Sequence, residues 1–244
     1  RPWYDRGERL SKKGISSQAS QAAQAAVQSS VATWNRLPGA GVLRMGGSGI
    51  SQVLLRVIAL SVGWSLTLCV STYCLFAAAM LGYEQPQLSA TFSAGAAITV
   101  FTQLWIFPKL VKAVGEHFAC AIGLTLLSSS LGAFSLLKLQ PLHSSLYFSA
   151  RIGSGVADTS TATLVARFST DSKDRARNLA LIQSTRAGAR IFTPLISGFL
   201  FERSRCSAVA PGALPYLVVA SLLTCLIPVP LVLRRFEESE SDGQ

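Results

Sequence analysis

Six long apolar runs occupy the chain from about residue 53 to residue 233, and short polar stretches separate them. The runs span residues 53–81, 88–110, 118–137, 142–168, 179–201 and 214–233. Because an α-helix rises about 1.5 Å per residue, each run can cross a hydrocarbon core about 30 Å thick. The joining stretches, at 82–87, 111–117, 138–141, 169–178 and 202–213, are short, so neighbouring helices should be antiparallel. The pattern predicts an all-α, polytopic membrane protein with six transmembrane helices.

Residues 1–50 have a different composition from the rest. Residues 1–13 are rich in charge, residues 17–33 are rich in Ala, Gln and Ser, and Pro38 and the glycines of 46–49 break any helix. We interpret residues 1–50 as a polar, basic segment and favour a flexible linker over a targeting remnant. Residues 51–235 form the predicted membrane domain and residues 236–244 an acidic tail. Since the chain starts with Arg1, we expect a fragment or a processed product.

Composition supports a membrane location. The chain is 50% hydrophobic and only 14% charged, whereas soluble domains carry roughly 25% charged residues. Between Val57 and Lys109 the only charged residue is Glu84. We therefore expect an integral, multi-pass protein of a plasma or organelle membrane, with the lipid bilayer as its main partner.

The net charge of +10 reflects membrane topology rather than nucleic-acid binding. Basic residues cluster in the loops between apolar runs and form no stripe with interleaved aromatic residues, so we expect no nucleic-acid partner. Of the 22 Lys and Arg residues, sixteen fall on one side of the predicted bundle and three on the other. The positive-inside rule then predicts that both termini face the cytoplasm or the equivalent side of an organelle membrane.

No pattern in the sequence indicates catalysis or a bound cofactor. The five cysteines show no CxxC spacing, so we expect neither a disulfide framework nor a metal site. The glycines of 46–49 lack the lysine of a phosphate-binding loop, and no nucleophile–base pair stands out. We expect no enzyme activity and no cofactor.

Four charged residues lie deep inside the apolar runs, away from their ends. Arg151 and Asp158 share one face of the fourth run, and Arg186 and Arg190 share one face of the fifth. A charge near the bilayer centre costs a few kcal/mol, so it needs a partner or an aqueous cavity. Counted from the basic side, Asp158 is about 15 Å deep and Arg190 about 16 Å deep. The sequence thus predicts a pair of Asp158 with Arg190, with Arg186 about one turn nearer the basic side.

These charges have two interpretations. They pair only to hold the bundle together, or they line an aqueous path that binds a proton or an anionic group. We favour the aqueous path, because three arginines and one aspartate leave positive charge without a partner. Gln103 in the second run and Gln183 in the fifth are further candidates for the lining of that path. His143 begins the fourth run, and we expect it at the membrane interface.

Small residues and one proline mark the same two runs. Gly153 and Gly155 lie in a stretch of small residues that permits close helix packing in lipid. In the fifth run, Pro194 removes a backbone hydrogen bond and should kink the helix, and Gly198 follows it. A close-packed helix beside a kinked one suits gating, although it also suits static packing.

Several of these segments together resemble the C-terminal half of a major facilitator superfamily transporter. RIGSG at 151–155 is similar to the family's fourth-helix signature, and TPLISGFL at 193–200 to its antiporter signature, with Thr193 and Ser197 in place of two glycines. PKLVKAVGEH at 108–117 is similar to the loop signature of the family: Leu110 and Gly115 match, and Lys112 stands where that signature has Asp. SKDRAR at 172–177 fills a short basic loop of the family. The resemblance covers residues 50–235.

The resemblance implies two inverted three-helix repeats that form half of a twelve-helix fold, with a missing N-terminal six-helix half as partner. It implies secondary active transport of a small solute by alternating access, with proton coupling, as in drug or metabolite antiporters. Asp158 would carry the proton, and Arg151, Arg186 and Arg190 would tune it or hold an anionic solute. Four further residues would be structural or gating residues: Gly115, Gly155, Pro194 and Gly198. The alternative is a non-transporting membrane scaffold or assembly subunit that retains the bundle.

Overall fold

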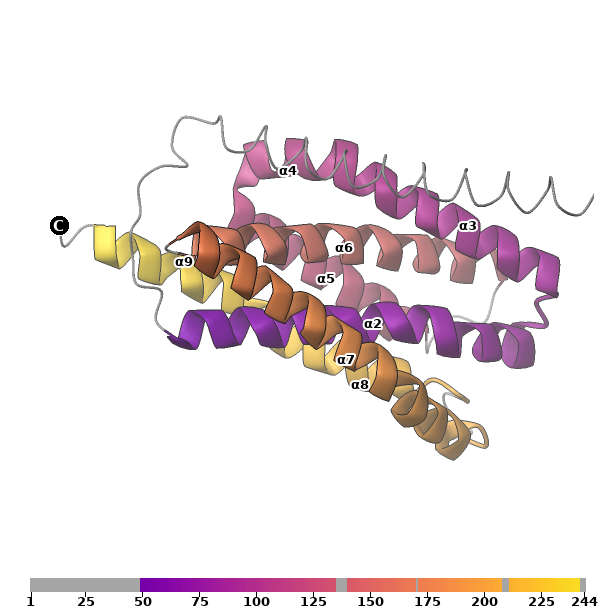
Figure 1. Ribbon diagram of the computed structural model, residues 1–244. Helices are drawn as coiled ribbons and strands as arrows, with labels where there is room; N and C mark the ends of the chain where they lie inside the picture. The colour runs from indigo at the N-terminus through magenta and orange to yellow at the C-terminus, as the bar shows by residue number, and fades with distance from the viewer. Residues whose placement is uncertain (1–48, 135–139, 170, 208–210, 242–244) are drawn as a thin grey trace, which may run out of the picture. The chain divides into compact units, whose positions relative to one another are not determined.

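The computed structural model describes residues 49–134, 140–169, 171–207 and 211–241. The chain divides into two units, Arg1–Arg44 and Met45–Gln244. The predicted linker therefore lies almost wholly outside the described residues, as does Lys138. Within the described ranges every regular element is a helix, and helices follow all six apolar runs. They are α2 (Gly49–Leu81), α3 (Gln85–Phe101), η1 (Thr102–Ile106), α4 (Phe107–Val114), α5 (Glu116–Phe134), α6 (Gln140–Arg167), α7 (Ser172–Ser204), α8 (Leu214–Leu226) and α9 (Pro228–Ser241) (Figure 1).

Four helical segments of the described chain are long and apolar enough to cross a membrane. They are Ser51–Ala79, Gln85–Val114, Glu116–Phe134 and Leu214–Glu237. This number is consistent with a multi-pass membrane protein. Helices α6 and α7 match the others in length, but they carry the internal charges and many Ser and Thr residues, which lower their apolarity. The prediction that all six segments span the membrane stays a prediction.

The second run is not a uniform α-helix. Its middle, η1, is a π-helical turn in which the Phe107 N–H donates to the Thr102 carbonyl. Pro108 follows directly and has no N–H, so it cannot donate the α-helical hydrogen bond to the Leu104 carbonyl. The wider π-helical turn lies where this regular hydrogen bond is missing. Helix α4 then ends at Gly115, whose φ of 84° is left-handed and turns the chain into α5.

The last run is also divided, and it is longer than predicted. Helix α8 ends at Leu226 and α9 begins at Pro228, with the Ile227 N–H donating to the Thr224 carbonyl between them. Pro228 and Pro230 lack backbone donors, which explains the break. Helix α9 continues to Ser241, so the start of the predicted acidic tail is helical.

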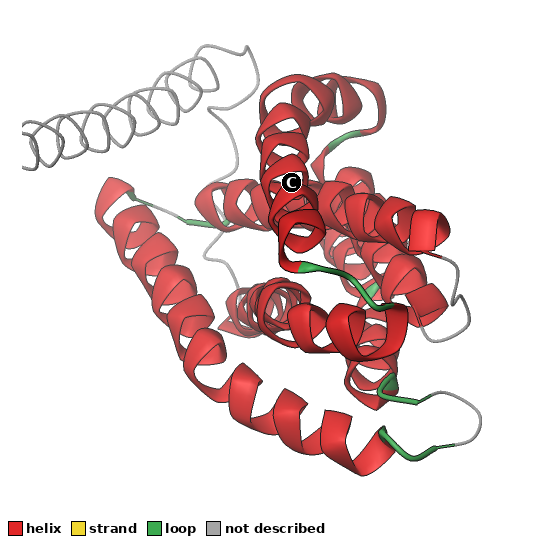
Figure 2. Cartoon of the chain, turned by 90° about the vertical axis from the view of Figure 1, so that its right-hand side faces the viewer, coloured by secondary structure: helices red, strands yellow, loops and turns green. Residues whose placement is uncertain are grey.

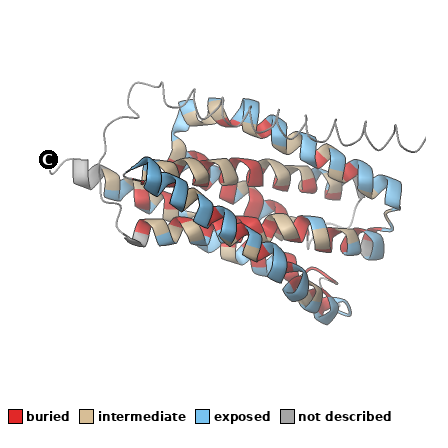
Figure 3. Cartoon of the chain, viewed as in Figure 1, coloured by how far each residue is buried: buried red, intermediate tan, exposed pale blue. Residues whose placement is uncertain are grey.

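The helices of residues 49–241 pack as a bundle around α6. Helix α6 packs against α5, α2, α3 and α7, while α5 also contacts α8 and α9, and α2 contacts α7 and α8 (Figures 1 and 2). One end of the bundle contains the start of α2, the junctions α4–α5 and α6–α7, and α9; we call it the basic end. Buried residues gather on α5 and the middle of α6, whereas α3 and α7 are largely exposed (Figure 3).

Helices α5 and α6 are in direct backbone contact. A Cβ atom added at Gly123 would lie 2.6 Å from the Ala157 nitrogen, and one added at Gly153 would lie 2.6 Å from the Leu127 nitrogen. No other residue type fits at either position without separating the helices. In lipid there is little hydrophobic free energy to gain from burying apolar side chains between helices. Close backbone packing of this kind is therefore a main source of helix association there.

An aromatic cluster fills the bundle away from the basic end. His143 is completely buried there, with its ring centroid 4.6 Å from that of Phe134 and 5.5 Å from that of Tyr73. Its Nδ1 lies 3.4 Å from the Tyr73 hydroxyl. Helix α6 starts at Gln140, and the His143 ring points inward from its first turn, between α2 and α5. The prediction that His143 lies at the depth of the membrane interface stays a prediction.

Replacement of Gly153 by Ala should destabilise the bundle, because the new methyl group would overlap the backbone of α5. Overpacking of this kind costs about 1–3 kcal/mol, which should lower the melting temperature in detergent by several degrees. The matched control is Gly188→Ala in α7, where an added Cβ meets nothing within 4 Å. G188A should melt at the wild-type temperature or slightly above it, and equal melting of the two variants would contradict the backbone contact.

Candidate functional site

The Asp158 carboxylate of α6 pairs with the Arg186 guanidinium of α7. The Arg186 Nη2 lies 2.5 Å from the Asp158 Oδ1 and also donates to the Asp158 carbonyl at 3.4 Å. The Arg186 side chain is 8% exposed and that of Asp158 is 25% exposed. The pair is therefore enclosed on the arginine side and open to the surroundings on the aspartate side.

Helix α2 makes room for this arginine. A Cβ atom added at Gly63 would lie 3.2 Å from the Arg186 Cγ, so the arginine stem lies directly against the α2 backbone. Three helices, α2, α6 and α7, thus meet at one charged pair. Desolvation of an unpaired charge costs several kcal/mol, and the pair offsets part of that cost by Coulomb attraction and hydrogen bonding.

The predicted partner of Asp158 was wrong: Arg186 forms the pair, and Arg190 is exposed. The depth was counted from residue 179, but α7 begins at Ser172, two turns earlier. Counted from Ser172, Arg186 lies about 21 Å along α7 and Arg190 about 27 Å, while Asp158 lies about 14 Å from the end of α6. Side chains lean toward the N-terminus of their own helix, so those of Arg186 and Asp158 converge. The Arg190 charge still acts on the Asp158 carboxylate from beyond ion-pair distance.

Arg151 lies apart from this pair, on the side of α6 that faces α3. Its Nε donates to the Gly95 carbonyl at 3.5 Å, and a Cβ atom added at Gly95 would lie 3.3 Å from the Arg151 Cγ and 2.6 Å from the Tyr147 ring. The side chain is partly exposed. Among the described residues, no carboxylate lies within ion-pair distance of Arg151. Its positive charge is therefore available to an outside partner.

A polar stripe runs along the outer face of α6. Arg151, Asp158, Thr159 and Thr163 are all partly exposed and recur at helical spacing. The opposite face carries Gly153 and is packed against α5. The polar side chains of α6 that remain partly exposed thus lie on the face away from α5.

The chain matches no protein-family model, no curated protein and no solved structure. Its function therefore has to be argued from the placement of its own residues.

The predicted glutamines do not join the pair. Gln183 is exposed on α7, and Gln103 is partly exposed within η1. Of the predicted gating residues, Gly155 packs against Thr99 and Thr102, with an added Cβ 3.4 Å from the Thr99 methyl group. That distance is ordinary van der Waals contact, so the packing of α6 against α3 and η1 does not require a glycine at this position.

The other predicted gating residues lie at turns and in α7. Gly115 forms the left-handed turn between α4 and α5. Pro194 is exposed inside α7, which curves along its length (Figure 2). An added Cβ at Gly198 would meet nothing within 4 Å, so this glycine is not required by packing within the described chain.

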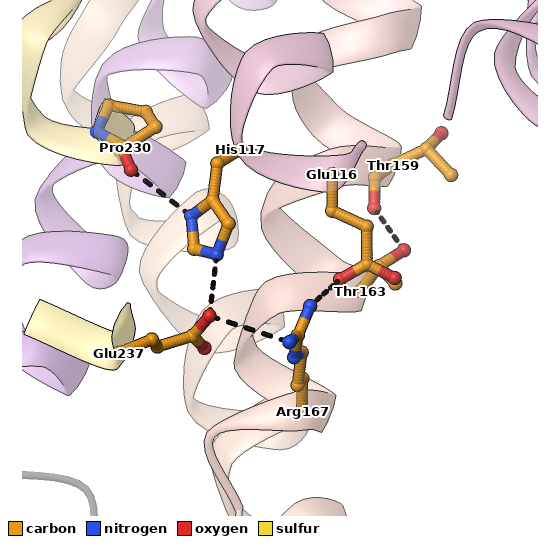
Figure 4. Close-up of polar contacts among 7 residues, drawn as sticks. All are labelled: Glu116, His117, Thr159, Thr163, Arg167, Pro230 and Glu237. Atoms are coloured by element: carbon orange, nitrogen blue, oxygen red, sulfur yellow. Dashed lines mark hydrogen bonds and ion pairs between the residues drawn. The ribbon is translucent and has the colours of Figure 1, made fainter. Parts of the chain in front are cut away.

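A second charged cluster, which we call the end cluster, lies at the basic end and was not anticipated from sequence (Figure 4). It consists of Glu116 and His117 at the start of α5, Arg167 at the end of α6, and Glu237 of α9. Arg167 pairs with Glu237 at 3.4 Å and with Glu116 at 3.6 Å, and His117 Nε2 lies 3.1 Å from the Glu237 Oε2. The sequence feature that could have pointed to this cluster is Glu116-His117, directly after the helix-breaking Gly115. The predicted topology puts it at the same end of the bundle as the start of α7.

Further hydrogen bonds join the helices at the basic end. Arg56 of α2 donates to the Asn178 side chain at 3.3 Å, and Asn178 donates in turn to the Ser169 hydroxyl at 3.2 Å. Gln52 of α2 donates to the Phe168 carbonyl at 3.2 Å. These bonds fasten α2 to the α6–α7 junction.

Neutralisation of either partner of the central pair should destabilise the bundle more than neutralisation of both. Asp158→Asn leaves Arg186 uncompensated and Arg186→Gln leaves Asp158 uncompensated, each at a cost of up to about 3 kcal/mol. The double variant removes both charges and should recover part of the loss in melting temperature. Arg190→Gln is the control: its side chain is exposed, so the melting temperature should stay at the wild-type value. If R190Q melted like R186Q, the pair would be misassigned.

Proposed function

We propose that the chain is the six-helix C-terminal half of a secondary active transporter that resembles the major facilitator superfamily and moves a small solute by alternating access. The observation that carries the proposal is the polar stripe of α6, with the half-open pair of Asp158 and Arg186 at its centre. An ion pair that only holds helices together needs no access to solvent, and its enclosure carries a desolvation cost that pairing has to offset. The Asp158 side chain is 25% exposed, which fits a group that exchanges a proton.

On this proposal all six helical segments cross the membrane, as two inverted three-helix repeats. The apolar surface of α7, which includes Ile191, Phe192, Leu195 and Phe199, supports a lipid- or protein-facing location despite the charges of this helix. The concentration of Lys and Arg at the basic end supports a cytoplasmic or equivalent location of both termini.

The proposed proton carrier is Asp158. Protonation of its carboxylate would leave Arg186 without a counter-charge, and the arginine would then seek another anion. Arg151 on α6 and Arg190 on α7 add further positive charge. A solute with a carboxylate or phosphate group could replace the ionised Asp158 as the partner of these arginines, so that the proton and the anionic solute would bind together and be carried in the same direction.

Two features support motion of the elements beside the stripe. The π-helical turn η1 interrupts the helix on the α3 side, and Pro194 interrupts the backbone hydrogen bonds of α7 on the other side. Wide turns and prolines are common sites of bending in helices. The missing half would cover the stripe from the opposite side and complete the path.

The proposal is tested in liposomes that contain the full-length protein, with internal pH reported by a trapped dye. Addition of the transported solute from a panel of carboxylates, phosphate esters and cationic amphiphiles should change internal pH. Asp158→Asn should abolish the change, because no proton can be carried. Arg190→Gln should also abolish it while the amount of folded protein stays unchanged.

The matched control is Arg203→Gln, an exposed base near the end of α7, which should keep wild-type flux. An absence of flux across the whole panel, together with stably co-purifying partner proteins, would favour a membrane scaffold and overturn the proposal.

A further inference from the structure

Both ring nitrogens of His117 face hydrogen-bond acceptors. Nδ1 lies 3.1 Å from the Pro230 carbonyl oxygen and Nε2 lies 3.1 Å from the Glu237 Oε2 (Figure 4). A carbonyl oxygen only accepts, so the Nδ1 must carry a proton. A neutral imidazole has one N–H, and its bare Nε2 would then face an ionised carboxylate, which is also only an acceptor.

The contact between His117 Nε2 and Glu237 therefore needs a proton that a neutral histidine and an ionised glutamate do not have. Arg167 lies 3.4 Å from the same Glu237 Oε2 and favours the ionised carboxylate, which assigns the extra proton to His117. Charge balance agrees: Arg167 and an imidazolium at His117 match the two carboxylates of Glu116 and Glu237. We propose that the end cluster is a proton-binding site in which protonated His117 ties α9 to the start of α5.

The charged side chains that other helices bring to His117 come from α6 and α9. From α6 the site receives Arg167, and from α9 it receives Glu237, while Arg234 of α9 lies over the neighbouring Phe118 ring at 4.9 Å. Helix α8, which also packs on α5, has no charged residue, and the Lys109 and Lys112 side chains of α4 are exposed. Among side chains of ordinary proton affinity, only histidine changes charge between about pH 5 and 8.

Loss of the proton should loosen α9. A neutral His117 can keep its bond to the Pro230 carbonyl or donate to Glu237, but not both, and the remaining nitrogen then repels an oxygen. The regular hydrogen-bond ladder between α8 and α9 is interrupted at Ile227, directly before Pro228, so we expect α9 to bend there when its contact with α5 weakens. The site would thus report pH on the basic side of the membrane, and this inference needs neither proton transport by Asp158 nor a missing half.

The proton count is measured on the full chain in detergent by nitrogen NMR of histidine side chains. The chain has two histidines, His117 and His143, so His117→Gln assigns the signals. At pH 6 both nitrogens of His117 should be protonated. In Glu237→Gln the amide can donate to a bare Nε2, so the second proton should be lost at a lower pH than in the wild type. A neutral His117 at pH 6, or identical titrations in the wild type and E237Q, would overturn the proposal.

The consequence for α9 is measured by trypsin cleavage after Arg234 and Arg235, relative to cleavage after the exposed Arg203 and Arg205 in the same sample. This ratio cancels the pH dependence of the protease. It should rise severalfold from pH 6 to pH 8 in the wild type and stay high at both pH values in His117→Gln. His143→Phe, which keeps an aromatic ring in the buried cluster, should retain the wild-type response. A wild-type ratio that does not change with pH would show that the proton does not hold α9.

Discussion

Direct backbone contact between α5 and α6 sets the rotation of α6 about its own axis. Gly123 and Gly153 bring the two helices so close that an added Cβ at either position would overlap the facing backbone. With Gly153 turned toward α5, the residues about half a helical turn away must face outward. Arg151, Asp158 and Thr159 occupy that outward face. The position of every charge on α6 is therefore a consequence of two glycines that carry no chemistry of their own.

The rotation of α6 in turn determines which helices complete the charged site. Asp158 faces the side on which α7 crosses, and Arg186 reaches it along a path that Gly63 of α2 leaves open. Arg151, two turns earlier on the same face of α6, extends toward α3, where Gly95 has no side chain to block it. Glycines thus have two roles in this bundle. They permit backbone contact between α5 and α6, and on α2 and α3 they leave space for the long side chains of arginines.

The order, type and approximate bounds of the helices could be predicted from sequence because apolar runs of helix length leave few alternatives. The pairing of Asp158 could not, because the charged first two turns of α7, Ser172 to Asn178, carry no apolar signal and shifted the estimated depth of Arg186 and Arg190. The π-helical turn before Pro108 depends on a local choice between two hydrogen-bond patterns, and a sequence does not specify it. The end cluster joins three helix ends that are distant in sequence, so Glu116 and Glu237 gave no joint pattern.

The central pair also matters for how α6 and α7 stay together. Apart from the short junction at the basic end, α7 packs mainly against α2 rather than α6. The Asp158–Arg186 pair is thus the principal polar tie between the two helices away from that junction. Because the Asp158 side chain is partly exposed, a single proton on its carboxylate would weaken this tie, whereas the α5–α6 backbone contact carries no charge. The bundle thus has one helix contact that does not depend on charge and one that does, and the proposed coupling of proton binding to movement of α7 belongs to the second.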